Sequence, residues 1–329
     1  MEIVFPDPEN KYMLSHYTES ENGIVKLAGN QYNYSSKMFS SGTVKEFYLK
    51  NGLFQGFEDE LSRKVEAKIK NKKTKIMGIL NATPDSFFGG SRITGTGIVD
   101  RMIDMKPDII DIGGESTRPG SSEVDPETEF SRIKGIVEYI KSVSNIPVSI
   151  DSRHYETINR SIAYGIEYIN DISGFGDRRM IDIARDSGAK CILMHMRGTP
   201  QNMGQFTHYD NIFAEINMFF YNRANSMVNA GIDPDNIILD PGIGFSKDFE
   251  GNISILRSPW SFFLGFDTLF GTSRKGFIGK VTGSGIDDRV GGTVATSIYL
   301  NNNGVDVIRV HDVLPNRDAI KMYRYIDDF

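Results

Sequence analysis

The sequence predicts an α/β fold in which eight parallel strands close into a (β/α)8 TIM barrel, preceded by an N-terminal extension. From Lys75 onward, short apolar segments alternate with longer amphipathic ones. This alternation is typical of a parallel sheet covered by helices on both faces. It occurs eight times, which favours a closed barrel over an open doubly wound sheet. The length of 329 residues suits either two domains or one such barrel, which often exceeds roughly 200 residues.

Eight apolar and often β-branched segments are the expected strands. In order they are 75–81, 108–114, 147–151, 167–174, 190–196, 236–240, 267–273 and 305–312. Helical patterns occupy 126–143, 154–165, 178–188, 211–231 and 288–304. Several of these end in glycine, as helix carboxyl termini tend to. We therefore expect a barrel over 75–329 and an extension over 1–74.

The extension does not share this alternation. It holds short mixed segments and ends in the lysine-rich stretch LSRKVEAKIKNKKTK, residues 61–75. A solvated helix leading into the barrel is the simpler interpretation of that stretch. An interaction arm is the alternative, and the fold and role of the extension stay open.

Composition excludes several classes of protein. A net charge of -6 and a pI of about 5.5 argue against a broad nucleic-acid-binding face. Cys191 is the only cysteine, which excludes disulfides within the chain and thiolate metal cages. The first residues, MEIVFPDPEN, are acidic and contain proline, unlike a signal peptide, and no apolar run approaches about 18 residues. We expect a cytoplasmic protein with no membrane and no nucleic-acid partner.

Polar side chains gather where the expected strands end. They are Asn81, Glu115, Thr117, Arg118, Asp151, Asn170, Asp171, His195, Asp240, Ser273, Arg274, Lys275, Arg309 and His311. A terminal aspartate or asparagine is often only a helix cap or a turn former. Because the carboxyl ends of barrel strands meet at one face, a polar residue on nearly every strand instead predicts an active site there.

One part of this set suits a flat, nitrogen-rich ring. Asp151 and Asp240 are acceptors, and Asn170 both donates and accepts, so together they match an amidine-like edge. Lys275 would donate to a neighbouring carbonyl. Met194 and Phe245 would sandwich the ring or simply pack in the core.

Another part suits phosphate. Arg118, Arg309 and His311 form a cationic corner, since the guanidinium fork matches two oxygens at once. A salt bridge at the barrel bottom is the alternative for Arg309 and His311. Asn81 is a plausible Mg²⁺ ligand if phosphate oxygens and water complete the shell.

The stretch DPGIGFSKD, residues 240–248, places three glycine or proline residues directly after a strand that ends in Asp240. We expect its glycines to let a ring lie against backbone, and we assign Lys247 no role beyond the surface. His195 is equally consistent with orienting a loop, and Cys191 with a buried apolar position.

The ordered segments GILNATPDSFFGG, DIGGESTRPGS, SID, NDISG, LMHMRGTPQNM, DPGIGF, SRKGFIG and RVHDV resemble the signatures of the dihydropteroate synthase family. The resemblance runs from about Lys75 to Val313. It implies a folate-pathway transferase that joins 6-hydroxymethyl-7,8-dihydropterin diphosphate to 4-aminobenzoate and releases diphosphate with Mg²⁺ assistance. It also implies that a homodimer through late helices is possible, which the apolar SIYL at 297–300 permits.

The resemblance also implies a role for each matched residue. The pterin would be held by Asp151, Asn170, Met194, Asp240, Phe245 and Lys275. The diphosphate would meet Thr117, Arg118, Arg309 and His311, and Asn81 would hold the metal. The aminobenzoate site would be shaped by Phe87, Thr117, Pro119, Ser273 and Arg274. The catalytic set would be Asp151, Lys275, Arg309 and His311.

The chain departs from the family pattern near the amine site. Phe88 and Gly89 stand where a serine and an aspartate are usual, and Gly276 replaces a usual serine. The stretch 201–210 lacks a proline often found near its centre. These departures leave the identity of the amine open more than that of the pterin.

Three alternatives follow. The same transfer to a modified arylamine, as in a methanopterin-like pathway, fits the same residues. A pterin-binding corrinoid methyltransferase domain shares the barrel but handles no diphosphate, so it has no use for STRPG, SRK and RVHD together. A non-enzymatic pterin-binding module would be expected to have lost charges from the rim.

Overall fold

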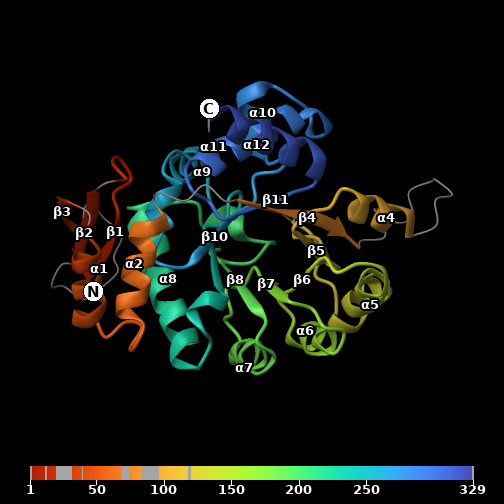
Figure 1. Cartoon of the computed structure of the whole chain (residues 1–329), viewed down its shortest axis with the longest axis horizontal. Coiled ribbons are helices and arrows are strands. Elements are labelled where there is room, and N and C mark those ends of the chain that lie inside the picture. The colour runs from red at the N-terminus through yellow and green to blue at the C-terminus, as the bar shows by residue number, and fades with distance from the viewer. Residues whose placement is uncertain are drawn as a thin grey trace.

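The fold is a closed eight-stranded parallel barrel with a small additional unit packed on one side (Figure 1). A computed structural model of the chain describes residues 2–11, 13–19, 32–38, 40–68, 74–82, 96–117 and 120–327. The strands follow one another around the barrel in chain order, from β4 to β11, and β11 pairs with β4 to close it. The predicted (β/α)8 barrel is confirmed.

Each predicted strand is present, with its ends within three residues of the expected ones. The barrel strands are β4 (Lys75–Asn81), β5 (Ile109–Gly113), β6 (Val148–Asp151), β7 (Tyr168–Asp171), β8 (Lys190–Met194), β9 (Ile237–Asp240), β10 (Asp267–Phe270) and β11 (Val307–Val310). Their residues are almost all buried, because side chains pack both inside the barrel and against the outer helices.

Helices cover the outside of the barrel. They are α4 (Thr96–Asp104), α5 (Pro126–Val143), α6 (Tyr155–Ile162), α7 (Arg178–Ser187), α8 (Ile212–Asn229), α9 (Phe249–Arg257), α10 (Gly276–Thr282), α11 (Val290–Asn302) and α12 (Val313–Asp327). Local signals set their ends: the Asp125 side chain caps the first turn of α5 by accepting from the backbone N–H of Thr128. Gly188 ends α7 in the left-handed conformation that glycine favours.

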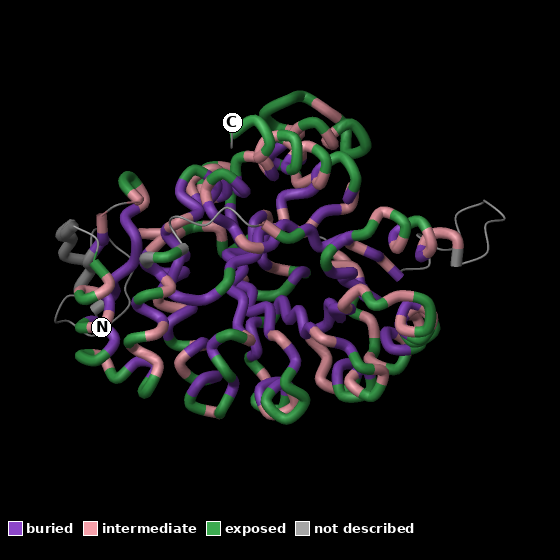
Figure 2. The backbone as a smooth tube through the Cα atoms, in the orientation of Figure 1, coloured by how far each residue is buried: buried purple, intermediate pink, exposed green. Residues whose placement is uncertain are grey.

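The barrel is filled rather than hollow at its centre. Met77, Ile109, Tyr168, Ile192, Ile238, Leu269 and Val307 form one cluster inside it. A larger cluster fills the space between strands and helices and continues into the N-terminal unit. In Figure 2 the buried residues follow the strands, while the outward turns of the helices are exposed. Cys191 lies fully buried in β8, as expected for an apolar position.

The extension has a fold of its own that the sequence pattern did not predict. Strands β1 (Glu2–Pro6), β2 (Met13–Glu19) and β3 (Tyr32–Met38) form an antiparallel sheet, followed by α1 (Ser41–Lys50) and α2 (Glu58–Lys68). This unit lies beside α8 (Figure 1). The lysine-rich stretch does begin as a helix, but Leu61 and Val65 of α2 are buried, so this helix is packed rather than fully solvated.

Hydrogen bonds and aromatic rings hold the extension to the barrel. Tyr221 of α8 donates to the carbonyl of Val4, and the Trp260 indole donates to the carbonyl of Asp7 at 2.8 Å. Tyr48 donates to the carbonyl of Leu264 at 3.0 Å. The rings of Tyr48, Phe54, Tyr221 and Phe266 stack edge to face or tilted at centroid distances of 5.2–6.2 Å. Extension and barrel therefore share one core.

Within the described ranges, we find no helix both long and apolar enough to span a lipid bilayer.

Candidate active site

The polar strand ends meet at one mouth of the barrel. Cα pairing sets Asn81 beside Gly113, Gly113 beside Asp151, and Asp151 beside Asn170. It also sets Met194 beside Asp240. Because all eight strands are parallel, these residues lie at the same end, which is where barrel enzymes carry their chemistry. The expected gathering of side chains at one rim is therefore present.

Arg309 links two carboxylates inside this mouth. Its Nε donates to Asp111 Oδ2 at 2.6 Å, and one terminal nitrogen donates to Asp151 Oδ2 at 2.6 Å. Burial disfavours the charged guanidinium, but the two carboxylates outweigh it and raise the pKa of Arg309. The alternative for Arg309 was a salt bridge at the barrel bottom. Arg309 does form ion pairs, but one of them is with Asp151, which ends its strand at the mouth.

Asp111 is a site residue that sequence reasoning missed. It is fully buried in β5 and accepts from Asn170 Nδ2 at 3.2 Å as well as from Arg309. It therefore holds two residues that the sequence analysis assigned to different parts of one substrate, Asn170 to the pterin and Arg309 to the diphosphate. The available signal was an aspartate flanked by isoleucines inside a strand, since a buried carboxylate must have a partner.

Asp151 takes up a proton more readily than a solvent-exposed aspartate, because its pKa is raised. Burial, the largest influence, raises the pKa of Asp151 to about 7, Arg309 lowers it, and the neighbouring carboxylates of Asp111, Glu129 and Asp171 raise it further. Among the described residues, no donor reaches the second oxygen of either Asp151 or Asp111. Buried acceptors without partners point to a ligand that brings N–H groups.

Asp240 and Lys275 are two further charged residues of this mouth, and each charge influences the pKa of the other. Asp240 Oδ1 accepts from the backbone N–H of Gly242 at 2.8 Å. Burial raises the pKa of Asp240 to about 6, although the Gly242 N–H and the charges of Lys275, Lys247 and Arg309 lower it. Burial and the Arg309 charge lower the pKa of Lys275 to about 8, with Asp240 and Asp151 opposing them.

The glycines of the 240–248 loop are packed closely against neighbouring residues. Gly242 has φ +70°, and a Cβ there would come within 2.2 Å of the His195 carbonyl oxygen. Gly244 has φ +81°, and a Cβ there would lie 3.1 Å from Cδ of Lys275. A side chain at these positions would therefore collide with the loop after β8 or crowd the Lys275 side chain. That a ring lies against this backbone stays a prediction.

An apolar wall adjoins these charges. Met194 and Phe245 are buried in one cluster with Ile172 and Met203. The Lys275 ammonium lies 4.3 Å from the centre of the Phe245 ring, a cation–π distance. The two residues therefore belong to a packed wall of the mouth, with the lysine over the phenylalanine.

Ser273 and His311 are joined at the other side of the mouth. His311 Nδ1 lies 3.0 Å from Ser273 Oγ, and this hydroxyl also accepts from the His311 backbone N–H at 3.1 Å. Burial and the charges of Arg309 and Arg274 lower the pKa of His311 to about 4. The imidazole is therefore neutral near pH 7, so His311 adds a polar group but no charge to the expected cationic corner.

Arg274 forms an ion pair with Asp312, which limits the movement of its side chain. Its Nε and one terminal nitrogen donate to the two carboxylate oxygens at 3.0 and 2.7 Å. Thr117 is half-buried on the loop after β5. Phe87, Arg118 and Pro119, together with Phe88 and Gly89, lie outside the described residues.

Lys247 is buried, so its assignment to the surface was wrong. Its side chain is 7% exposed, and its ammonium lies 3.1 Å from Nδ1 of His195. Burial lowers the pKa of Lys247 to about 7, and burial together with the Lys247 and Arg197 charges lowers the pKa of His195 well below 6.5.

Two places among the described residues offer groups that could hold a metal ion. Asn81 is half-buried and, with His311, borders a cavity of about 530 Å³ between β4, α4 and α12. Glu115, Glu129 and His154 bring ligand atoms within 4.8 Å of one another, but Arg153 already lies 3.2 Å from Glu115. The second group is therefore better described as a neutralised ion-pair cluster beneath the loop after β5.

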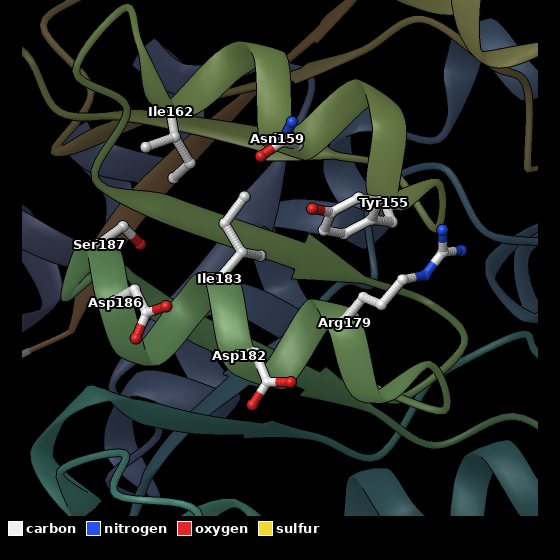
Figure 3. A pocket seen from close by; sticks show the side chains of 8 residues that line it. All are labelled: Tyr155, Asn159, Ile162, Arg179, Asp182, Ile183, Asp186 and Ser187. Atoms are coloured by element: carbon white, nitrogen blue, oxygen red, sulfur yellow. The ribbon is translucent and has the colours of Figure 1, made fainter.

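A further pocket of about 440 Å³ lies on the outside of the barrel (Figure 3). Tyr155 and Asn159 of α6 and Ile183 of α7 line it, and Arg179 stacks over Tyr155 at 4.5 Å. Arg179 is also paired with Asp177 at 2.6 Å. This pocket between outer helices shares no residue with the mouth.

The variant D111N is expected to lower the pKa of Asp151 below about 7. It removes a negative charge that favours protonation of Asp151, and it leaves Arg309 to serve Asp151. A carbon-13 NMR titration of the Asp151 carboxyl measures this. The surface variant D104N should leave that pKa unchanged. An unchanged pKa in D111N would show that Asp111 does not influence the protonation of Asp151.

Comparison with known proteins identifies relatives of the whole barrel. Residues 77–311 match the family described as pterin binding enzyme. The dihydropteroate synthase of Clostridium beijerinckii is 41% identical over 258 residues, covering 76% of this chain and 93% of that protein. The dihydropteroate synthase of Escherichia coli is 37% identical over 252 residues, covering 75% and 89%.

Solved structures agree. The Yersinia pestis dihydropteroate synthase, in complex with a sulfonamide drug, has a TM-score of 0.74 at 33% identity and covers 78% of this chain and 95% of that one. The Xanthomonas albilineans dihydropteroate synthase with 4-aminobenzoic acid has a TM-score of 0.73 at 33% identity, covering 78% and 94%. That of Clostridium difficile, in the presence of pteroic acid, has 0.72 at 38%, covering 78% and 97%.

Proposed function

Because the chain belongs to the pterin-binding enzyme family, we propose that it catalyses the dihydropteroate synthase reaction of folate biosynthesis. The methylene carbon of (7,8-dihydropterin-6-yl)methyl diphosphate forms a bond with the amine nitrogen of 4-aminobenzoate. The bond from that carbon to diphosphate breaks, and the amine loses a proton. The observation that carries this proposal is the barrel mouth, where two buried carboxylates lacking full complements of donors lie beside Arg309 and Lys275.

The pterin ring would lie against the apolar wall and bond the buried charges. Asp240 would accept from the N–H groups of one edge, and Lys275 would donate to the neighbouring carbonyl. Asn170 and the second oxygen of Asp151 would meet other ring nitrogens, which supplies the donors that oxygen lacks among the described residues. Met194 and Phe245 would pack on the ring faces.

The leaving group would meet the cations. Arg309 uses two N–H groups for Asp111 and Asp151, and a guanidinium has five, so three remain for phosphate oxygens. Arg118 and Thr117 would complete this subsite, with neutral His311 as a further hydrogen-bonding group. Positive charge that builds on the methylene carbon would be stabilised by the carboxylates of Asp151 and Asp240.

We assign the metal position to Asn81. One amide oxygen beside a cavity fits Mg²⁺ as an ion whose other ligands are water and diphosphate. When bound there, Mg²⁺ would neutralise charge on the departing diphosphate. The amine subsite would be formed by Phe87, Thr117, Pro119, Ser273 and Arg274.

A homodimer through the late helices is part of the proposal. Its support is a set of exposed apolar side chains on α11 and α12, namely Tyr299, Met322, Tyr325 and Ile326. Such surface is often covered by a partner. A monomeric mass in sedimentation velocity would contradict it. For the domains, we assign residues 75–329 to the catalytic barrel and 1–74 to the extension that packs on it.

Purified protein with Mg²⁺, the dihydropterin diphosphate and 4-aminobenzoate is expected to form dihydropteroate and diphosphate in equal amounts. Coupled detection of diphosphate and chromatography of the product measure both. A panel of arylamines tests the departures at Phe88, Gly89 and Gly276. Diphosphate release with another arylamine but not with 4-aminobenzoate would overturn the substrate and keep the reaction type; no release with any amine would overturn the proposed function.

A further inference from the structure

The buried ammonium of Lys247 has three hydrogen-bond acceptors around it. They are Nδ1 of His195 at 3.1 Å, the His195 carbonyl at 3.3 Å and the Phe245 carbonyl at 2.9 Å. An ammonium group has three N–H donors, so this set is complete. When Lys247 is charged, its ammonium can only donate, so His195 Nδ1 then accepts and the neutral imidazole carries its proton on Nε2.

These acceptors belong to two different loops. His195 begins the loop after β8, and Phe245 lies in the loop after β9. Other bonds join the same loops: the Arg197 N–H donates to Ser246 Oγ at 2.9 Å, and Tyr209 donates to the Ser246 carbonyl at 3.1 Å. Lys247 is thus part of a connection between two loops, and it is the member of that connection that bonds Phe245.

The connection lies directly behind the apolar wall. Met194 precedes His195, and Phe245 carries the ring over which Lys275 is placed. A Cβ on Gly242 would meet Lys247 Nζ at 3.4 Å and the His195 carbonyl at 2.2 Å, so the backbone here is closely packed. A shift of the His195 or Phe245 carbonyl would therefore move Met194, Phe245 or Lys275.

A charged side chain is a costly way to fill this space. Burying an ammonium without a directly bonded carboxylate costs free energy that an apolar side chain would avoid. The charge does have one long-range partner, because it helps hold the Asp240 carboxylate ionised. The connection between the loops and the influence of the Lys247 charge on Asp240 both concern the same half of the mouth, where Asp240, Phe245 and Met194 lie.

We propose that Lys247 is a positioning residue for the pterin half of the site, which ties the loops after β8 and β9 together and so fixes Met194 and Phe245 for the ring. This inference rests on the proposed function, since that function assigns the pterin to this wall. Lys247 acts through these residues and not on the substrates themselves. Its loss should therefore affect the pterin and spare the amine.

The test compares K247M with the native protein. K247M keeps the length of the side chain but removes all three donors. The dissociation constant for a pterin, measured by calorimetry, is expected to rise about tenfold, since displacements of about 1 Å in positioning groups have effects of this order or larger. The KM for 4-aminobenzoate is expected to stay within about twofold. A folded K247M with unchanged pterin affinity would overturn the proposal.

A second variant covers failure of K247M to fold. K247R keeps the charge, but its planar fork does not match three acceptors arranged around an ammonium. We expect a smaller loss of pterin affinity, about threefold, and no loss would overturn the proposal. K280M removes an exposed lysine of α10 and should change neither constant.

The calorimetric readout also separates this inference from the proposed function. Native protein that binds the pterin but forms no product with any arylamine would contradict the proposed reaction, while the K247M comparison would still decide the role of Lys247. Native protein that turns over normally, with K247M equal to it in pterin affinity, would contradict the role of Lys247 alone.

Discussion

Replacing Arg309 by methionine is expected to lower kcat by about a hundred- to a thousandfold, the usual effect of removing a preorganised group that stabilises developing charge. Arg309 is the cation between Asp111 and Asp151, each at 2.6 Å. Its loss leaves two buried carboxylates without their counter-ion, which should also cost about 3–5 kcal/mol of stability. Steady-state diphosphate release and chemical unfolding measure the two effects.

Two further variants define the cause. R178M removes an exposed arginine of α7 that pairs with Asp182 at 3.3 Å, and it should leave turnover unchanged. R309K keeps the charge but cannot reach both carboxylates with a fixed fork, so its kcat should lie between those of R309M and the native protein. Native turnover in R309M would show that Arg309 does not contribute to the reaction.

The variant D240N is expected to weaken pterin binding by about ten- to a hundredfold, because a hydrogen bond to a charged group contributes about 1.5–3 kcal/mol. An asparagine also presents an NH₂ group where the ring presents donors. Calorimetry with a pterin measures the dissociation constant.

The pH dependence gives an independent readout of the same residue. Burial raises the pKa of Asp240 to about 6, so the accepting carboxylate exists above that pH and is lost as the pH falls through it. Pterin affinity of the native protein should therefore decrease below about pH 6, and D240N should lack that part of the decrease. Protonation of Asp151 remains in both proteins.

The matched control lies in the same loop. Asp248 caps α9 by accepting from the Gly251 N–H at 2.7 Å, and asparagine caps helices about as well. D248N should bind the pterin as the native protein does. Equal affinity in D240N and D248N would show that Asp240 does not bond the pterin.

The barrel could be predicted from sequence because its signals are local. Eight apolar segments alternate with helical patterns, and the helix expected over 126–143 is α5 (Pro126–Val143) to the residue. Several expected strands were too long at their carboxyl ends, as in 267–273 against β10 (Asp267–Phe270). The extra residues belong to the loops that follow the strands, as do Thr272 and Ser273 after β10.

Site residues could be predicted where they end a strand at the rim. They could not be predicted where their role depends on a partner far away in the sequence. Lys247 stands between polar residues, and nothing local shows that its ammonium meets His195, 52 residues earlier. Asp111 was missed because its partners, Asn170 and Arg309, lie on other strands. The charge of His311 depends on burial and on Arg309, neither of which is visible in the sequence.

The extension was unpredictable for the same reason. Its apolar segments are short, and their burial depends on distant parts of the barrel. Tyr221 of α8 bonds the carbonyl of Val4, 217 residues away, and Tyr48 bonds the carbonyl of Leu264. By themselves the segments carry no clear helical or strand period.

The aromatic contacts between the extension and the barrel limit how far the enzyme can be shortened. Cutting the chain to the region that matches the family, which begins at residue 77, would remove Tyr48 and Phe54 from the rings of Tyr221 and Phe266. The truncated barrel would then expose an apolar surface to water, and such a surface favours self-association. We therefore expect the shortest stable form of this chain to be longer than the region that carries the chemistry.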